Sequence, residues 1–189
     1  MDGHRILGFD LDPECGPRFL EATGSRGRFL TGDLLKEDAI PDERFDLVLM
    51  MGNFLMEFRD PRDLRTAFRH AAASLDPGGR LVMDDVPSAG WAEIADGRWA
   101  SGLDESGTMQ MVWAPCDPEF VLRMGDDIDL EADRILDHER VLRLWSRREL
   151  DDAAGFAHLR PVAGVETTTP GLLLYERSGL GNDAPESTV

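Results

Sequence analysis

The chain has 189 residues, and its 20 basic and 37 acidic side chains give a formal net charge of −17 at pH 7. Nucleic acid is therefore excluded as an expected partner, because a phosphate backbone is normally met by a basic surface. Apolar residues make up 42% of the sequence, which is typical of a globular protein and excludes overall disorder. At this length we expect one folded domain with a short appendage.

The cysteines and the first residues indicate a soluble, cytoplasmic protein. Cys15 and Cys116 lie far apart and form no C-x-x-C motif, so we expect neither a disulfide framework nor a zinc site. No apolar run approaches the roughly 20 residues that a membrane span needs, and residues 1–5 do not open a signal peptide. We therefore expect no membrane partner.

The first half of the chain alternates apolar runs with helical segments. Strands are expected at Arg5–Asp10, Arg28–Asp33, Phe45–Met51 and Arg80–Met83, and helices at about 13–23 and from Asp60–Pro61 to Leu75. Strands that alternate with helices imply a parallel, doubly wound sheet. The apolar spacing of the second helix places His70 on its exposed side.

After Val86 the pattern changes to short strands, which predicts a small antiparallel insert at about 100–145. Its strands are expected at Thr108–Pro115, Glu119–Met124 and Ile135–Trp145. A capping box from Ser146 to Glu149 opens a helix to Ala154, and two last strands are expected at Leu159–Thr168 and Leu172–Arg177. One domain is thus predicted over 1–177, followed by a polar, disordered tail over 178–189.

Polar residues stand where three of the predicted strands end. These residues are Asp10, Asp33 and the pair Gly52–Asn53. The carboxyl ends of parallel strands line the crevice in which open α/β sheets bind ligands, and an acid at the place of Asp10 can accept both hydroxyls of a ribose. The alternative is that these residues are turn aspartates of the kind that often follow strands.

Four segments, in this order along the chain, resemble the motifs of the class I S-adenosylmethionine-dependent methyltransferases. They are Gly8–Asp12, Gly32–Leu34, Phe45–Asn53 and Leu75–Leu81. The resemblance extends over about Arg5–Arg177 and implies a Rossmann-like α/β fold with the antiparallel insert as a lid. It also implies S-adenosylmethionine as the cofactor.

The resemblance implies a role for seven residues. Asp10, with Leu11 beside it, corresponds to the acid that binds the cofactor ribose. Asp33 corresponds to the aspartate that faces the adenine amino group, and Leu34 to the residue that packs on the ring. The resemblance places Met51, Gly52 and Asn53 beside the methionine part of the cofactor.

The implied function is methyl transfer to a nitrogen or oxygen atom of a small-molecule acceptor. Asp85 and the lid residues near Trp91 are the candidates for a catalytic base. Nothing in the sequence selects one of them, so no catalytic base is assigned. Large apolar side chains of the lid, such as Trp99 and Trp113, suit an aromatic or sugar-derived acceptor, and the alternative is that they only pack the insert on the sheet.

One departure from the family is large. Its first strand and glycine-rich loop, D/E-x-G-x-G, have no counterpart before Ile6, so we expect either a start placed too late by roughly 40 to 60 residues or a degenerate, impaired enzyme. The sheet would then have an open edge, which a partner chain or a second copy would cover. A non-catalytic module that binds a partner through this edge is the alternative function.

Two further motifs are weighed against other families. Ile6–Asp12 also resembles the opening of haloacid-dehalogenase-like, magnesium-dependent phosphatases, with Gly125–Asp129 as the later acidic motif, although the only lysine, Lys36, comes too early for that family. The acids from Asp126 to Asp133 do not form an EF-hand, since Ala132 stands where glycine is needed. We assign no metal, and none to His70 or His138.

Overall fold

The computed structural model describes residues 3–37, 40–86, 90, 102–104, 106–115, 118–131 and 134–178. Its chain divides into two compact units, Met1–Arg44 (unit 1) and Phe45–Val189 (unit 2), which we describe separately. Several predicted features lie outside the described residues: Trp91, Trp99, Cys116, Ala132, Asp133 and the tail from 179 to 189.

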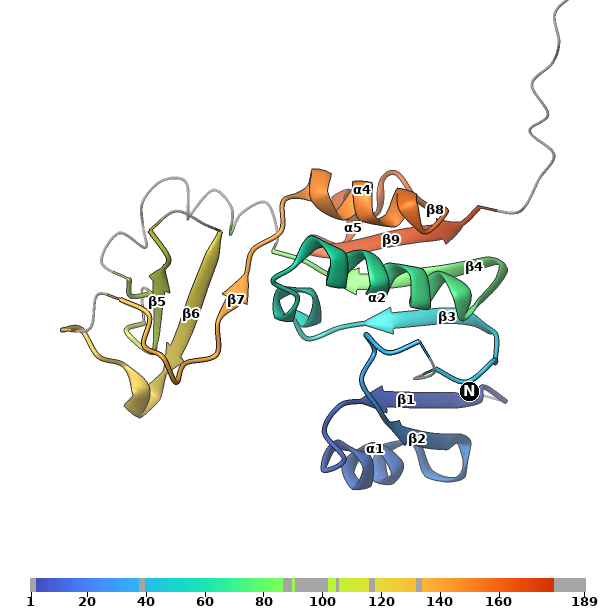
Figure 1. The fold of residues 1–189 in the computed structure, drawn as a ribbon. Coiled ribbons are helices and arrows are strands. Elements are labelled where there is room, and N and C mark those ends of the chain that lie inside the picture. Colours follow the sequence, from blue (N-terminus) through green and yellow to red (C-terminus); the bar gives the residue numbers. More distant parts are fainter. Residues whose placement is uncertain are drawn as a thin grey trace, which may run out of the picture. The chain divides into compact units, whose positions relative to one another are not determined.

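Unit 1 has the predicted strand–helix–strand order (Figure 1). Its elements are strand β1 (Ile6–Asp10), helix α1 (Cys15–Thr23), the 3-10 turn η1 (Gly24–Arg26) and strand β2 (Gly27–Thr31). The two strands are parallel, and Asp10 pairs with Thr31 at their carboxyl ends. Gly8 allows the helix to come close to the sheet, because a Cβ atom there would lie 2.8 Å from the Phe19 ring.

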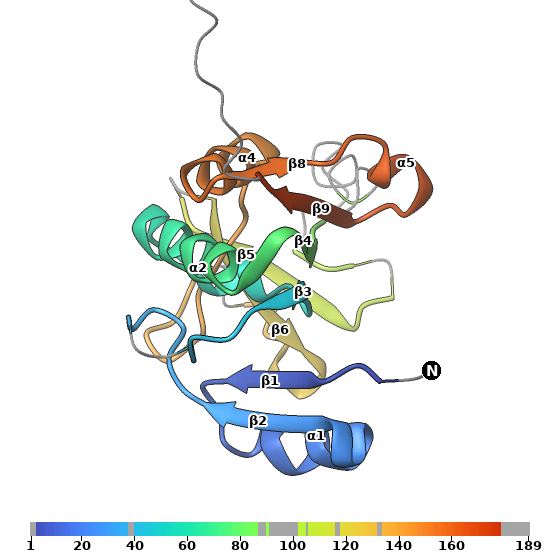
Figure 2. The same ribbon diagram turned by 90° about the vertical axis from the view of Figure 1, so that its right-hand side faces the viewer.

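Unit 2 is built on a four-stranded sheet in the order β3-β4-β9-β8 (Figures 1 and 2). Its strands are β3 (Phe45–Met50), β4 (Leu75–Asp84), β8 (Leu159–Pro161) and β9 (Leu172–Arg177). β3 and β4 are parallel, whereas β9 runs antiparallel to both β4 and β8. The strand expected at Arg80–Met83 begins earlier, at Leu75, and its regular pairing with β3 resumes at Arg80 after an irregularity between Phe45 and Leu47.

Helices α2 (Pro61–Ala73) and α4 (Arg147–Phe156) lie against one face of this sheet (Figures 1 and 2). The largest fully buried side chains gather between these layers; they include Leu64, Phe68, Leu81, Met83, Leu150, Leu173 and Tyr175. The Phe68 and Tyr175 rings meet edge to face at 5.9 Å. On the other face of β3, Leu47 and Leu49 are 49% and 60% exposed.

Both helices start at the caps that their sequences predict. The Asp60 side chain accepts a hydrogen bond from the Arg62 N–H, and Pro61 occupies the first turn of α2. Ser146 and Glu149 form the complete capping box of α4, each side chain accepting from the other residue's backbone N–H.

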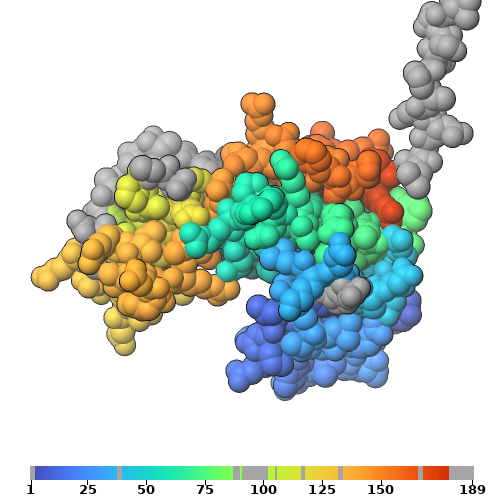
Figure 3. Space-filling view, in the orientation of Figure 1, coloured from blue at the N-terminus to red at the C-terminus, as the bar shows by residue number. Residues whose placement is uncertain are grey.

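The predicted insert is present as a second, three-stranded sheet in unit 2. Its elements are β5 (Met109–Trp113), β6 (Glu119–Met124), the 3-10 turn η3 (Gly125–Asp127) and β7 (Leu142–Arg143), with antiparallel order β5-β6-β7. Two ion pairs join this insert to the segment before α2: Glu57 with Arg140 at 2.7 Å, and Arg59 with Glu119 at 2.9 Å. Figure 3 shows the insert in yellow and orange beside the teal start of α2.

Three predicted elements differ from the structure. The strand expected at Ile135–Trp145 is confined to Leu142–Arg143, because the residues before it hydrogen-bond to a buried arginine instead of a neighbouring strand. The strand expected at Leu159–Thr168 ends at Pro161, and its last residues form the short helix α5 (Val165–Thr168). Helix α4 continues two residues beyond Ala154.

The expected exposure of His70 is wrong, since this residue is buried. Helix α2 packs against α4 as well as against the sheet. A helix with two covered sides buries a wider arc than its apolar stripe alone indicates.

No helix among the described residues is long and apolar enough to cross a membrane.

Candidate functional site

In unit 1, two carboxylates stand at the carboxyl ends of adjacent parallel strands. Asp10 is the last residue of β1, and Asp33 follows the end of β2 by two residues. The N–H of Gly32 donates to the Asp10 carbonyl at 2.9 Å and thereby ties the two strand ends together. The two acids therefore follow adjacent strand ends in unit 1.

Each of these acids is also held by its own turn. One Asp10 oxygen accepts from the Asp12 N–H at 2.9 Å, and one Asp33 oxygen accepts from the Leu35 N–H at 2.9 Å. The turn-aspartate alternative therefore describes one part of what these carboxylates do. A carboxylate can accept several hydrogen bonds, so each of these acids can accept one from a ligand hydroxyl or amino group in addition to the one within its turn.

Apolar side chains accompany these acids. Leu11 is 70% exposed directly after Asp10, and Leu34 follows Asp33 and is half-buried. An apolar surface beside hydrogen-bond acceptors suits a flat ring that carries polar groups at its rim. The arrangement in unit 1 can therefore bind a nucleoside-like molecule.

The electrostatic potential at this edge is negative. Partial desolvation and then the charges of Asp10 and Asp12 raise the pKa of the Cys15 thiol. Cys15 is exposed, but a raised pKa keeps it as a thiol near neutral pH, which disfavours a nucleophilic role. The same negative potential favours a cationic ligand.

In unit 2, Met51–Asn53 follows strand β3 and is exposed. Gly52 and Asn53 both have left-handed backbone angles, with φ of 87° and 58°. The Asp84 carboxylate at the end of β4 accepts from the Gly52 N–H at 2.7 Å and from the Asn53 N–H at 3.1 Å. A carboxylate from the neighbouring strand thus fixes this turn.

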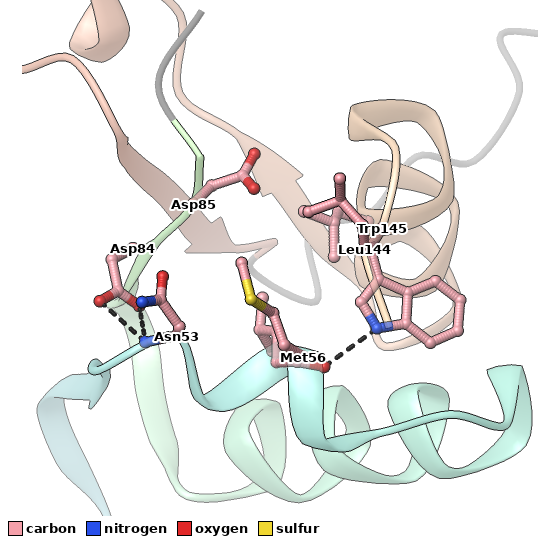
Figure 4. A pocket seen from close by; sticks show the side chains of 8 residues that line it. Asn53, Met56, Asp84, Asp85, Leu144 and Trp145 are labelled. Carbon is pink, nitrogen blue, oxygen red and sulfur yellow. Dashed lines mark hydrogen bonds between the residues drawn. The ribbon is translucent and has the colours of Figure 1, made fainter. Parts of the chain in front are cut away.

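A small cavity of about 10 Å³ lies beside the turn. Its lining residues are Asn53, Leu55, Met56, Asp84, Asp85, Leu144, Trp145 and Leu150. Figure 4 shows Asp84 directed at the turn and Asp85 directed away from it. The Trp145 indole N–H donates to the Leu55 carbonyl at 3.0 Å, which fixes the residues after the turn as well.

The seven residues predicted to bind the cofactor thus form two groups. Asp10, Leu11, Asp33 and Leu34 lie together in unit 1, and Met51–Asn53 lies in unit 2. That both groups line one crevice stays a prediction. Sequence reasoning assigned no role to Asp84, although an acid at the end of another parallel strand was a usable signal.

Metal-ligating side chains do not cluster in the described part of the chain: no group of three or more His, Cys, Asp or Glu could hold an ion there. The acidic residues Asp126 and Asp127 form the exposed turn η3 of the insert.

Comparison with known proteins gives a family match over the first part of the chain. Residues 1–83 match the family profile described as a methyltransferase domain. This match covers less than half of the chain. No curated protein gives a significant match to the sequence. The methyltransferase match includes Ile6–Asp12, the segment that also resembled the phosphatases, and so favours the methyltransferase interpretation of it.

Solved structures confirm the Rossmann-like α/β fold. CalS10 from Micromonospora echinaspora, an amino pentose methyltransferase, is 19% identical with a TM-score of 0.61 over 92% of this chain and 74% of its own. An S-adenosylmethionine-dependent methyltransferase from Clostridium acetobutylicum is 15% identical with a TM-score of 0.64 (93% and 75%). The sugar N-methyltransferase KedS8 from Streptoalloteichus is 20% identical with a TM-score of 0.58 (91% and 70%).

Proposed function

We propose that this domain transfers a methyl group from S-adenosylmethionine to a nitrogen or oxygen atom of a small molecule. The observation that carries the proposal is the pair Asp10 and Asp33, which stands at adjacent strand ends with exposed apolar surface beside it. This pair lies within the segment that matches the methyltransferase domain. The match supports the type of reaction, and the acids support the place of the nucleoside.

Each group of residues has a distinct part in binding. The Asp10 carboxylate accepts hydrogen bonds from the ribose hydroxyls, and the Asp33 carboxylate accepts one from the adenine amino group. Leu34 packs on the adenine ring. The exposed turn Met51–Asn53 holds the methionine end. When bound, S-adenosylmethionine supplies a methyl group on a positively charged sulfur, which the negative potential near Asp10 favours.

The acceptor is a small molecule held by the insert side of the domain. Methyl transfer needs mainly orientation and exclusion of water, so no strong base is required and no catalytic residue is assigned. CalS10 and KedS8 are described as amino pentose and sugar N-methyltransferases. Amine-bearing sugars are therefore the first acceptors to test, with their hydroxyl counterparts for comparison.

A non-catalytic, partner-binding module is the second candidate function, and one observation favours it. Among the described residues, β1 pairs only with β2, and β3 pairs only with β4. One edge of each of these two strands therefore has no paired neighbouring strand among the described residues of its own unit. Such an edge can pair with a strand of a partner chain or of a second copy.

A calorimetric titration with S-adenosylhomocysteine tests the proposed function. We expect the 189-residue chain to bind it, and Asp10→Ala to weaken binding by about tenfold or more, because two charged hydrogen bonds are lost. Glu21→Ala is the matched control, since Glu21 is an exposed acid on α1.

The outcomes separate the two functions. Binding that is weakened by Asp10→Ala and not by Glu21→Ala supports the ribose assignment, and equal affinity of all three proteins would show that assignment to be wrong. A chain that binds no S-adenosylhomocysteine, but is isolated with a second copy or a partner on a strand edge, would favour the non-catalytic module.

A further inference from the structure

The turn after β3 is held by one side chain from another strand. Both oxygens of the Asp84 carboxylate accept hydrogen bonds from it, at 2.7 Å from the Gly52 N–H and at 3.1 Å from the Asn53 N–H. Asp84 is half-buried at the end of β4, and Figure 4 shows its side chain directed at Asn53. Hydrogen bonds to a charged group are stronger than those to a neutral one.

The backbone of this turn needs such support. Gly52 and Asn53 are consecutive residues with positive φ, a conformation that asparagine tolerates but that is still unfavourable for a residue with a side chain. Two successive N–H groups that converge in this way form an anion-binding concavity. Here the concavity is filled by Asp84, so it is closed to a carboxylate of a ligand.

The same bonds decide what the turn offers to a ligand. The peptide bonds of the described chain are trans, and in a trans peptide the carbonyl points opposite to the N–H. Since the N–H groups of Gly52 and Asn53 point to Asp84, the carbonyl oxygens of Met51 and Gly52 point away from it. The turn therefore presents hydrogen-bond acceptors, which suit an ammonium group.

The end of the turn is fixed independently. The Met56 N–H donates to the Asn53 carbonyl at 3.0 Å, and the buried Trp145 indole donates to the Leu55 carbonyl at 3.0 Å. Asp84 binds the start of the segment Gly52–Leu55 and Trp145 binds its end. The segment therefore has one defined conformation before any ligand binds. Such preorganisation lowers the cost of binding.

We propose that Asp84 is a positioning residue of the cofactor site, which orients the turn so that the carbonyl oxygens of Met51 and Gly52 meet the ammonium group of the methionine part. This inference rests on the proposed function. Asp84 acts through the backbone of the turn and does not itself contact the ligand. An asparagine cannot replace it, because its amide has one acceptor oxygen and its NH₂ group would face a backbone donor.

The test compares two ligands on the full chain. S-adenosylhomocysteine carries the methionine-derived end, and 5′-methylthioadenosine lacks it. We expect Asp84→Asn to weaken binding of S-adenosylhomocysteine by about tenfold and to leave the affinity for 5′-methylthioadenosine within about twofold. Asp46→Asn is the control, because Asp46 is an exposed aspartate on β3 of the same unit.

A second readout requires no ligand. Amide hydrogen exchange should become faster at Gly52 and Asn53 in Asp84→Asn, while β4 and β9 keep their protection. If Asp84→Asn does not fold, Asp84→Glu replaces it, since it keeps the charge and moves the carboxylate by one methylene. The same selective loss for S-adenosylhomocysteine is expected.

The possible failures are distinguishable. A wild-type chain that binds neither compound would overturn the proposed function, and the inference with it. Wild-type binding with unchanged affinity of the Asp84 variants would overturn only the positioning role, as would an equal loss for both compounds, because that loss would not come from the methionine end.

Discussion

Arg123 is the most deeply buried charge among the described residues, with 4% of its side chain exposed. Its guanidinium donates to Glu139 at 2.5 and 3.0 Å, to the Arg134 carbonyl at 2.9 Å and to the Asp129 carbonyl at 3.3 Å. One side chain thereby holds the segment between β6 and β7, whose described residues form no strand before Leu142.

Glu139→Gln should therefore destabilise the insert strongly. The substitution leaves a buried guanidinium without its counter-charge, which has a cost of about 3–5 kcal/mol. Urea unfolding followed by Trp fluorescence would measure the loss. Glu131→Gln is the control on the same segment, because Glu131 is exposed. An equally small effect of both substitutions would contradict the expectation.

The same pair predicts a pH dependence. The hydrogen bond from Arg123 lowers the pKa of Glu139 to about 2 from its ordinary 4.5. Because the folded-state pKa lies below the unfolded one, the stabilisation is complete above about pH 5 and is lost as the pH falls toward about 2. Thermal unfolding across this range should show a smaller acid-induced loss in Glu139→Gln than in the wild type.

Single residues also show where the sequence was informative about the site. Asp10 and Asp33 could be predicted because each follows an apolar strand in its own local pattern. Asp84 could be recognised as an acid at a strand end, but its hydrogen bonds could not be predicted, because its partners lie 31 and 32 residues away in the chain and the parallel pairing of β3 with β4 brings them together. His70 was misassigned because the apolar spacing of α2 does not show that this position is buried.

At the scale of elements, two exposed ion pairs connect the insert to the segment between η2 (Phe54–Glu57) and α2. The bidentate pair of Arg59 and Glu119, with both distances 2.9 Å, lowers the pKa of Glu119 through its hydrogen bonds. Exposed pairs contribute about 0.2–1 kcal/mol each and are screened by salt.

Removing both pairs should loosen the insert without unfolding unit 2. In Glu57→Gln/Glu119→Gln we expect amide exchange in β5 and β6 to rise by about fivefold, equivalent to about 1 kcal/mol, with β4 and β9 unchanged. High salt should produce the same rise in the wild type and no further rise in the variant. Exchange that is insensitive to salt in the wild type would show that the pairs do not hold the insert.

Elements with apolar periodicity were predictable, and those stabilised by polar side chains were not. β3, β6 and α2 follow from apolar runs and caps that lie within each segment. The predicted strand Ile135–Trp145 also has apolar residues, but the Leu136 N–H donates to the Glu139 side chain, which itself binds Arg123, and no local pattern indicates such contacts. Local sequence thus identifies an element only where its partners are of the usual kind.

At the scale of the whole molecule, the buried apolar side chains are unevenly distributed. The buried hydrophobic residues begin at Met50 and all lie in unit 2, whereas in the described part of unit 1 only Gly8 and Gly16 are buried. A segment of about 40 residues seldom buries enough surface to be stable without further support. The sequence did not indicate this contrast, because apolar runs occur in both units.

Hydrogen exchange should therefore differ between the units. We expect amides of β1 and β2 to exchange at least tenfold faster than those of β4 and β9, because a smaller apolar core opens at a lower free energy. Mass spectrometry of peptic fragments would measure the rates. Addition of S-adenosylhomocysteine should slow exchange in unit 1 if Asp10 and Asp33 bind its nucleoside, and equal rates in both units would contradict the expectation.

The outward leucines of β3 have a consequence for the behaviour of concentrated solutions. The exposed side chains of Leu47 and Leu49 favour apolar association between molecules. The net charge of −17 opposes it, because it makes the molecules repel one another at neutral pH. Acid protonates the carboxylates, and concentrated salt shortens the range of the repulsion. Colloidal stability should therefore be greatest in dilute buffer above neutrality and should fall when the medium is acidified or made salty.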